Sequence, residues 1–138
     1  MDTEALRRGL RGIVRAGKVS SIYPERMTAR VTFADKDKNV SKELPVMNRN
    51  AAKNKDYWMP DVGDSVVCLF AQNDKNLSSG WILGTFFNEG SPPQSASADI
   101  RRLDFSDGTF IEYDRASHTL NINCVGVINI KGATVNIN

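Results

Sequence analysis

The sequence predicts an all-β protein that begins with a short helix, continues as a small five-stranded barrel and ends in a β-hairpin and a repetitive β segment. Three observations support this prediction. Five short strand-like runs precede position 88, a segment rich in Gly, Ser and Pro follows them, and a strand-length repeat occupies the last part of the 138 residues. We therefore divide the chain into an N-terminal helix (1–17), a barrel (18–88), a linker (89–99) and a β-repeat segment (100–138).

The N-terminal residues have helical periodicity. Leu6, Leu10, Ile13 and Val14 recur at the spacing of one helix face, which predicts an amphipathic helix over residues 2–16. Such a helix needs a partner surface to be stable. Its other face is basic and carries four arginines, Arg7, Arg8, Arg11 and Arg15. This basic face is either solvated, with the helix covering one end of the barrel, or it is a docking surface.

The five strand-like runs read as one antiparallel barrel. The run 65–71 is the most apolar, and we expect it to be a central strand buried on both faces. A long polar loop, 47–60, separates the third run from the fourth. Five short antiparallel strands with this loop length indicate a Greek-key barrel of the OB type. The expected strands are 18–23, 28–33, 40–46, 65–71 and 80–87.

A tight turn and a repeat follow the linker. Asp107-Gly108 between the runs 103–105 and 109–113 predicts a β-hairpin, because glycine supplies the positive φ that the turn needs. The pattern apolar-Asn-Ile-polar then begins three times, at Leu120, Ile128 and Val135. Each copy is one short strand with one apolar face.

The repeats predict self-association, because short strands of this kind cannot bury their apolar face without stacked neighbours. Three identical chains wound into an intertwined trimeric β-helix would supply those neighbours. The alternative is a plain β-meander packed on the barrel. The phase of the repeat shifts across Gly132-Ala133, where we expect a bulge or a turn. In the trimer, the residues expected to point toward the axis are Leu120, Ile122, Ile128, Ile130, Val135 and Ile137.

Composition excludes several classes of protein. Hydrophobic residues are 41% and charged residues 25% of the chain, as in soluble globular domains. The net charge of +2 is too small to indicate nucleic acid by itself, and no apolar run approaches the roughly 18 residues of a membrane span. Cys68 and Cys124 lack C-x-x-C spacing, and His118 is the one histidine. We therefore expect reduced thiols, no metal and no cofactor.

Several barrel motifs, taken in order, are similar to those of a known family. The segments Gly17–Tyr23 and Thr28–Phe33, then Leu44–Val46, resemble the first three barrel strands of the phage baseplate assembly protein V family. Tyr57–Val66 resembles that family's P-x-x-G-[DE]-x-V motif, and Gly80–Gly84 resembles its last barrel strand. The repeats resemble the β-helical needle of the same family, which forms the central spikes of contractile phage tails and tail-like bacteriocins and is related to the valine-glycine-repeat spike of type VI secretion.

The resemblance implies a homotrimeric central spike beneath the tail-tube hub, driven into the target envelope when the sheath contracts. Its partners would be the hub, tail-tube and baseplate wedge proteins, and the four N-terminal arginines would dock on the hub. The spike would be assembled in the bacterial cytoplasm and carried in a virion or an extracellular tail-like particle. The family's tip metal site needs a histidine pair and does not carry over. Because Asn138 ends a repeat strand, we expect a separate tip protein, the alternative being a blunt tip closed by the last residues.

Enzymatic activity is not expected. Asp35 and Asp37 form a carboxylate pair, but in a Lys-rich turn they are typical solvated charges. A glycosidase needs two carboxylates across a cleft. Four further acidic residues invite that interpretation, namely Asp104, Asp107, Glu112 and Asp114. Turns account for Asp107 and Asp114.

Two binding functions remain as alternatives. An OB barrel can bind single-stranded nucleic acid through aromatic side chains in a basic groove. The candidate residues for that function are Arg49, Lys53, Lys55, Tyr57 and Trp58. The aromatic pair sits at the end of the loop instead of alternating with the basic residues, and nucleic-acid binding would not explain the repeats. The second alternative is a carbohydrate-binding, adhesive module.

Overall fold

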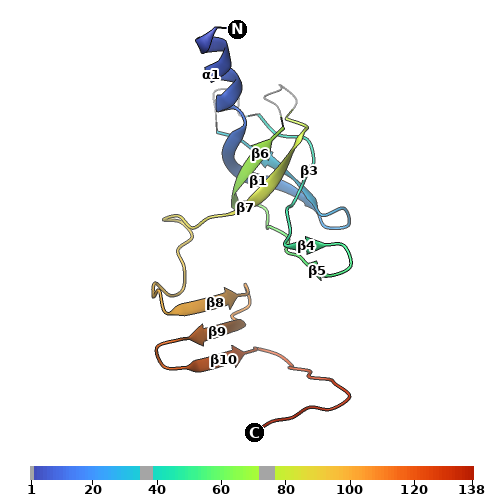
Figure 1. The fold of residues 1–138 in the computed structure, drawn as a ribbon, viewed down its shortest axis with the longest axis vertical. Helices are drawn as coiled ribbons and strands as arrows, with labels where there is room; N and C mark the ends of the chain where they lie inside the picture. The colour runs from blue at the N-terminus through green and yellow to red at the C-terminus, as the bar shows by residue number, and fades with distance from the viewer. Residues whose placement is uncertain (1, 35–38, 72–76) are drawn as a thin grey trace. The chain divides into compact units, whose positions relative to one another are not determined.

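The computed structural model describes residues 2–34, 39–71 and 77–138, without the side chains of residues 8–11. The chain divides into two compact units, Met1–Ser91 and Pro92–Asn138. This division falls inside the segment expected to be a linker. Figure 1 shows the helix and the larger sheet in the first unit and a small three-stranded sheet in the second.

The N-terminal helix is shorter than its periodicity predicts. Helix α1 (Thr3–Arg11) is capped by Asp2, whose Oδ1 accepts a hydrogen bond of 2.6 Å from the backbone N–H of Ala5. Strand β1 (Val14–Tyr23) begins three residues after the helix ends. The helix predicted over 2–16 is therefore wrong from Gly12 onward. Gly12 weakens the helix, and Val14 pairs with Leu69 in the sheet instead of completing a helical stripe.

The first unit is a nearly closed, five-stranded, OB-like barrel. Besides β1 it contains β2 (Thr28–Thr32), β3 (Leu44–Pro45), β6 (Ser65–Phe70) and β7 (Gly80–Thr85). The strand order is β3-β2-β1-β6-β7, and an isolated parallel bridge between Val46 and Ile82 joins the two edges (Figure 1). The predicted all-β class with a five-stranded barrel is confirmed at this level.

Three details of the barrel differ from the prediction. The third strand is only Leu44–Pro45, and Val40 is held by one isolated bridge to Thr32. The expected loop 47–60 contains a small hairpin of β4 (Asn50–Ala51) and β5 (Lys55–Asp56). Strand β6 is not buried on both faces: alternate side chains are fully buried and the others are half-buried.

The barrel core is formed by side chains from all five strands and the loops that join them. Phe33 and Phe70 meet edge to face, with ring centroids 5.9 Å apart. The guanidinium carbon of Arg15 lies 4.4 Å from the Phe33 ring centroid. The buried hydrophobic residues are Val19, Ala29, Val31, Phe33, Leu44, Val46, Val66, Cys68, Phe70, Leu77 and Ile82.

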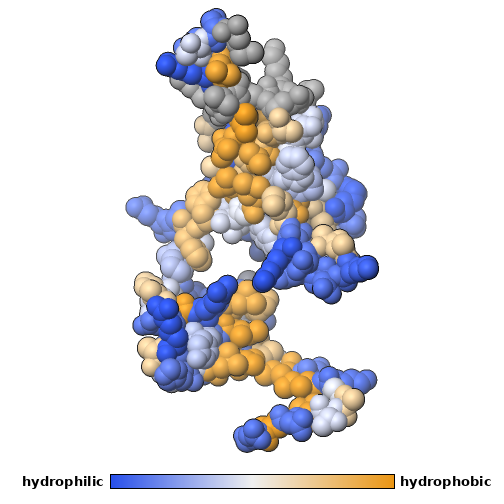
Figure 2. All heavy atoms as spheres, in the orientation of Figure 1, coloured by the Kyte–Doolittle hydropathy of each residue, from blue (hydrophilic) through white to orange (hydrophobic). Residues whose placement is uncertain are grey.

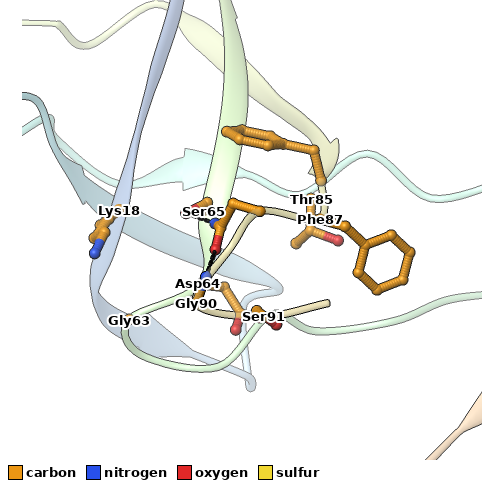
Figure 3. A pocket seen from close by; sticks show the side chains of 10 residues that line it. Lys18, Gly63, Asp64, Ser65, Thr85, Phe87, Gly90 and Ser91 are labelled. Carbon is orange, nitrogen blue, oxygen red and sulfur yellow. Dashed lines mark hydrogen bonds between the residues drawn. The ribbon is translucent and has the colours of Figure 1, made fainter. Parts of the chain in front are cut away.

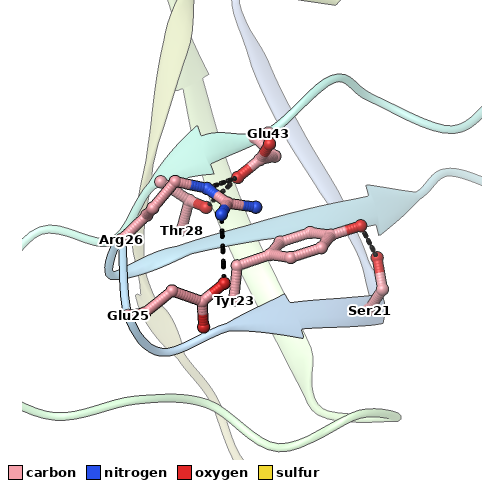
Figure 4. Close-up of polar contacts among 6 residues, drawn as sticks. All are labelled: Ser21, Tyr23, Glu25, Arg26, Thr28 and Glu43. Atoms are coloured by element: carbon pink, nitrogen blue, oxygen red, sulfur yellow. Dashed lines mark hydrogen bonds and ion pairs between the residues drawn. The ribbon is translucent and has the colours of Figure 1, made fainter.

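Polar contacts fix the turn between β1 and β2 and tie it to β3, as Figure 4 shows. Arg26 Nε donates to Glu43 Oε1 at 2.9 Å, and Thr28 Oγ1 donates to the same oxygen at 2.6 Å. The guanidinium also pairs with Glu25 and lies 4.9 Å from the centroid of the Tyr23 ring. These contacts tie the β1–β2 turn to Glu43, the residue that precedes β3.

The second unit is a three-stranded antiparallel sheet followed by an extended tail. Its strands are β8 (Ile100–Asp104), β9 (Phe110–Asp114) and β10 (Thr119–Asn123), in the order β10-β9-β8. The predicted Asp-Gly hairpin is confirmed, since Gly108 has a φ of 96° and the Thr109 N–H donates to Asp107 Oδ1. Residues 124–138 form no regular strand within this chain and bend at 125–126 and 133–134. The second bend adjoins the predicted irregularity.

Candidate assembly surfaces

The small sheet has one apolar face. The register places Leu103, Ile111 and Ile122 opposite one another across the three strands, and Tyr113 opposite Leu120. Directly paired residues of antiparallel strands share a face. We call this the apolar face. It comprises Leu103, Ile111, Tyr113, Leu120 and Ile122, and Phe105 continues it by alternation beyond β8. The exposed Arg101, which pairs with Tyr113, lies on the same face.

The apolar face is more exposed than the charged side chains Arg102 and Glu112 on the opposite face. The six apolar residues are 40% to 60% exposed. On the opposite face, the Glu112 side chain is 15% exposed and the Arg102 side chain 22%. This is the reverse of the usual burial preference of these residue types. A sheet needs a second layer to bury its apolar face, and within this unit the described residues supply none.

The polar face is organised by Arg102. Its guanidinium donates to Asp104 Oδ1 and to Glu112 Oε1, each at 2.8 Å, and lies 3.8 Å from the centroid of the Phe110 ring. Hydrogen bonds to both carboxylates raise the pKa of Arg102. The network accounts for the burial of the charged side chains on this face.

The remaining carboxylates of the predicted set serve turns. Hydrogen bonds from Thr109, first from its backbone N–H and then from its side chain, lower the pKa of Asp107. Asp114 Oδ1 accepts a hydrogen bond from the Ala116 N–H at 2.9 Å. His118 lies in the turn before β10 with a φ of 56°. Asp35 and Asp37 lie outside the described residues. Among those described, no group of three or more His, Cys, Asp or Glu side chains is placed to hold a metal ion.

The structure brings together only part of the predicted axis set. Leu120 and Ile122 lie on the apolar face of β10, and the other four follow in the extended tail, where they are 49% to 87% exposed. Sequence reasoning missed the members on β8 and β9. The alternation Leu103-x-Phe105 and Ile111-x-Tyr113 on either side of the Asp-Gly turn was the available signal.

A second exposed apolar surface lies on the outer wall of the barrel. Val14, Leu69 and Trp81 form one row across β1, β6 and β7, and Ala16 and Val67 form the next. Figure 2 shows apolar side chains gathered over these strands. Val14 is 59% exposed and Trp81 43%. We call this the wall patch, and it comprises Val14, Ala16, Val67, Leu69, Trp81 and Leu83.

The four arginines expected to dock do not share one helix. Arg7 is exposed on α1, and Arg8 and Arg11 belong to the same helix, with side chains outside the description. Arg15 instead lies in β1, with its guanidinium over Phe33.

The family-like motif before β6 has a structural role. Gly63 has a φ of 95°, and its N–H donates to the Val19 carbonyl oxygen at 2.8 Å. The Val19 N–H in turn donates to the Asp64 carbonyl oxygen at 3.0 Å. The motif therefore forms the turn that aligns β6 beside β1.

A pocket of about 290 Å³ lies beside this turn, where the chain leaves β7 (Figure 3). Lys18, Asp64 and Phe87 contribute to its lining. Asn88 Nδ2 donates to Ser65 Oγ at 3.1 Å, and Asn88 Oδ1 accepts from the Gly90 N–H at 2.9 Å. Asn88 thus anchors the exit from the barrel.

The aromatic pair considered for nucleic-acid binding is split. Trp58 is half-buried against the barrel core, and its Nε1 donates to the Met47 carbonyl oxygen at 2.9 Å. Tyr57 is 68% exposed beside the exposed Lys55. The Trp58 indole therefore packs and hydrogen-bonds as part of the barrel.

The sequence matches no protein-family model. It is similar to a curated protein, the spike protein of Escherichia phage P2, with 25% identity over 122 residues. The matched region is 88% of this chain and 56% of the relative, so the chain spans about half the length of that protein. The matched region is longer than either unit of this chain and therefore includes residues of both. This distant similarity supports a phage baseplate spike family and fits a component of a virion. No helix in the described part of the chain is long and apolar enough to cross a membrane.

Proposed function

We propose that this protein is the trimeric central spike of a contractile tail baseplate, which pierces the target envelope when the sheath contracts. The observation that carries the proposal is the exposed apolar face on β8–β10, continued by apolar repeats, in a chain similar to a phage spike protein. An exposed apolar surface of this kind marks an interaction site.

Three copies of the chain would supply the missing second layer. The stretches 127–132 and 135–138 lie between and after the bends and have strand length. Wound around a three-fold axis, they would pair with neighbouring chains and turn Ile128, Ile130, Val135 and Ile137 inward. Asn129 and Asn136 would face outward, because strand side chains alternate.

The other partners follow from the position of a spike in a tail. The basic helix, with Arg7, Arg8 and Arg11, would face the tail hub and tube proteins, and Arg15 would stay in the barrel beneath it. Baseplate wedge proteins would surround the barrel, and contact with the target envelope would be transient. Assembly would take place in the bacterial cytoplasm, before the virion or tail-like particle is released.

The spike would be a structural protein without enzymatic activity. Glu112 serves an ion pair and Asp114 a turn, and Cys68 is buried in the core with a pKa raised by burial to about 12. Muralytic zymography tests this part of the proposal. A cleared band that disappears when one carboxylate is replaced would contradict it.

Mass in solution tests the trimer. Static light scattering should give about three times 15.3 kDa. Ile130→Asp would bury a charge at the axis in three copies and should block assembly. Asn129→Asp adds the same charge to the outward face and is the matched control, which should remain trimeric. A monomeric native protein, or an Ile130→Asp protein that assembles normally, would reject the proposal.

A further inference from the structure

In the described part of the chain, the wall patch has no cover, and the side chains described for α1 have no surface to pack on. Residues 2–7 are all exposed, including Leu6 at 52%. A nine-residue helix is too short to be stable alone in water, since isolated helices below about 12–15 residues are marginal. The helix therefore needs a partner surface.

The described residues of α1 do not cover the wall patch of their own barrel, because Leu6 and Val14 both remain more than half exposed. The Phe70 N–H donates to the Ile13 carbonyl oxygen at 2.7 Å, which holds the chain in the β1–β6 ladder from Ile13 onward. Only Gly12 remains between this anchor and Arg11, the last residue of α1. Connections between a helix and a strand usually take about 2–6 residues, so Gly12 and Ile13, which join α1 to β1, are at the short end of that range. This arrangement leaves the described apolar side chain of α1, Leu6, available to another chain.

The dimensions of the two surfaces match. The row Val14–Leu69–Trp81 crosses three strands, so it spans two strand spacings, about 9.6 Å. A helix with its side chains is about 10 Å wide. The patch has no charged member, while Lys18 lies at its rim and Asp2 lies at the start of the helix, on the same side as Leu6. One helix would cover the patch and bring opposite charges to its edge.

We propose that α1 of one chain packs across the wall patch of a second copy of this chain, with Leu6 against Val14, Leu69 and Trp81. Helix and patch are different surfaces, so the contact is heterologous, and repeating it generates a ring if the rotation closes. Closure after three copies rests on the proposed trimer, whereas the helix–wall contact does not. The contact would join the barrels independently of the β-repeat segment.

Site-directed crosslinking between two differently labelled chains tests this contact. Both chains carry Cys124→Ser, and the native Cys68 is buried in the core. One chain carries Leu6→Cys and the other Leu83→Cys, and the co-expressed pair is treated with a short bismaleimide. Because each chain has one reactive thiol, the Leu6–Leu83 product links two chains. We expect this heterodimer to be the main crosslinked product.

The matched control replaces Leu6→Cys with Glu4→Cys, which lies on the other side of the same helix. Its yield with Leu83→Cys should be at least fivefold lower. Absence of the Leu6 heterodimer, or equal yields from both positions, would overturn the proposal. The masses of the uncrosslinked proteins separate the two proposals. A trimer that gives no crosslinked heterodimer would support the spike proposal and reject the helix contact. A crosslinked heterodimer from a protein that is not trimeric would support the helix contact and reject the trimeric spike.

Discussion

Burial alternates along β6 in the first unit and along β9 in the second, but the more buried set is apolar in β6 and includes the carboxylates Glu112 and Asp114 in β9. In β6 the apolar Val66, Cys68 and Phe70 are buried. In β9 the apolar Ile111 and Tyr113 are exposed, while Glu112 between them is half-buried. The barrel closes its core with residues of one chain. The small sheet leaves its apolar face exposed, and this is the face on which the proposed trimer would place other chains.

Removing residues 100–138 should have the largest effect, because it deletes the small sheet and leaves the barrel. The barrel keeps its whole core, because every buried hydrophobic residue lies at or before Ile82. We expect a folded protein that has lost the trimer at micromolar concentration, seen as a threefold fall in mass by light scattering with an unchanged thermal transition of the barrel. Loss of the barrel fold would show that the two units are not independent.

Two isoleucine substitutions compare the units directly. Ile82→Ala removes a fully buried side chain from the barrel core and should lower the free energy of unfolding by about 2–5 kcal/mol. Ile122→Ala removes a side chain that is 56% exposed in one chain. Its effect should appear as weaker association. Denaturation at several protein concentrations separates them, because only the Ile122→Ala loss should depend on concentration.

Local sequence signals predicted most of the strands and failed where tertiary pairing decides. The alternation in Arg30–Phe33 and the Asp107-Gly108 turn were sufficient for their hairpins. Ile13 and Val14 fit a helical stripe equally well, and only pairing with β6 makes them strand-like. The β4–β5 hairpin has two residues in each strand and is too short to give a periodic pattern.

The candidate surfaces could be predicted only in part for a related reason. The repeats were visible because they recur along the chain, whereas the contribution of Ile111 and Tyr113 depends on register with β8 and β10. The wall patch depends on the row that three non-consecutive strands form. Arg15 was assigned to the helix because the helix was drawn too long.

Gly17→Ala tests how tightly the barrel is closed. A Cβ at this position would lie 2.6 Å from the Thr32 carbonyl oxygen and 2.7 Å from Val31 Cγ1. Overpacking of this kind typically costs about 1–3 kcal/mol. Chemical denaturation should show that loss. Gly126→Ala in the second unit is the control, because nothing lies within 4 Å of its Cβ position, and it should leave the barrel transition unchanged.

The two cysteines report on the two units. Burial raises the pKa of Cys68 to about 12, so its thiol should resist iodoacetamide at pH 8 until the barrel unfolds. Cys124 is only half-buried in one chain and should react while the protein is folded, more slowly in the assembled form. Mass spectrometry of the alkylated peptides measures both rates. Rapid labelling of Cys68 in the folded protein would contradict a closed core.

The same thiol makes barrel stability depend on pH at the alkaline end. The folded pKa of Cys68 lies above the ordinary cysteine value near 8.5, so the folded state holds the proton more tightly. Its contribution is complete below about pH 8.5 and is lost as the pH rises toward 12. Cys68→Ala should flatten the stability profile in that window, measured by denaturation between pH 8 and pH 11.

The smallest expected effect concerns the exposed ion pair between Arg26 and Glu43. The hydrogen bond from Arg26, then that from Thr28, lowers the pKa of Glu43. Stability from this carboxylate is present above its ordinary pKa and is lost as the pH falls through the lowered folded value. Arg26→Gln should move the Glu43 pKa upward, measured by NMR titration of its side-chain carboxyl carbon.

Asp107 in the second unit provides the internal control for that titration. Its lowered pKa comes from Thr109, so Arg26→Gln should leave it unchanged. Because Glu43 is solvent-exposed, screening by water and salt should keep the change in stability below that of any core substitution. An unshifted Glu43 would mean that Thr28, whose hydroxyl donates to the same oxygen, holds the carboxylate without Arg26. A shift in Asp107 as well would instead show that the two units are coupled, and the contrast between a self-sufficient barrel and an open sheet would then be incomplete.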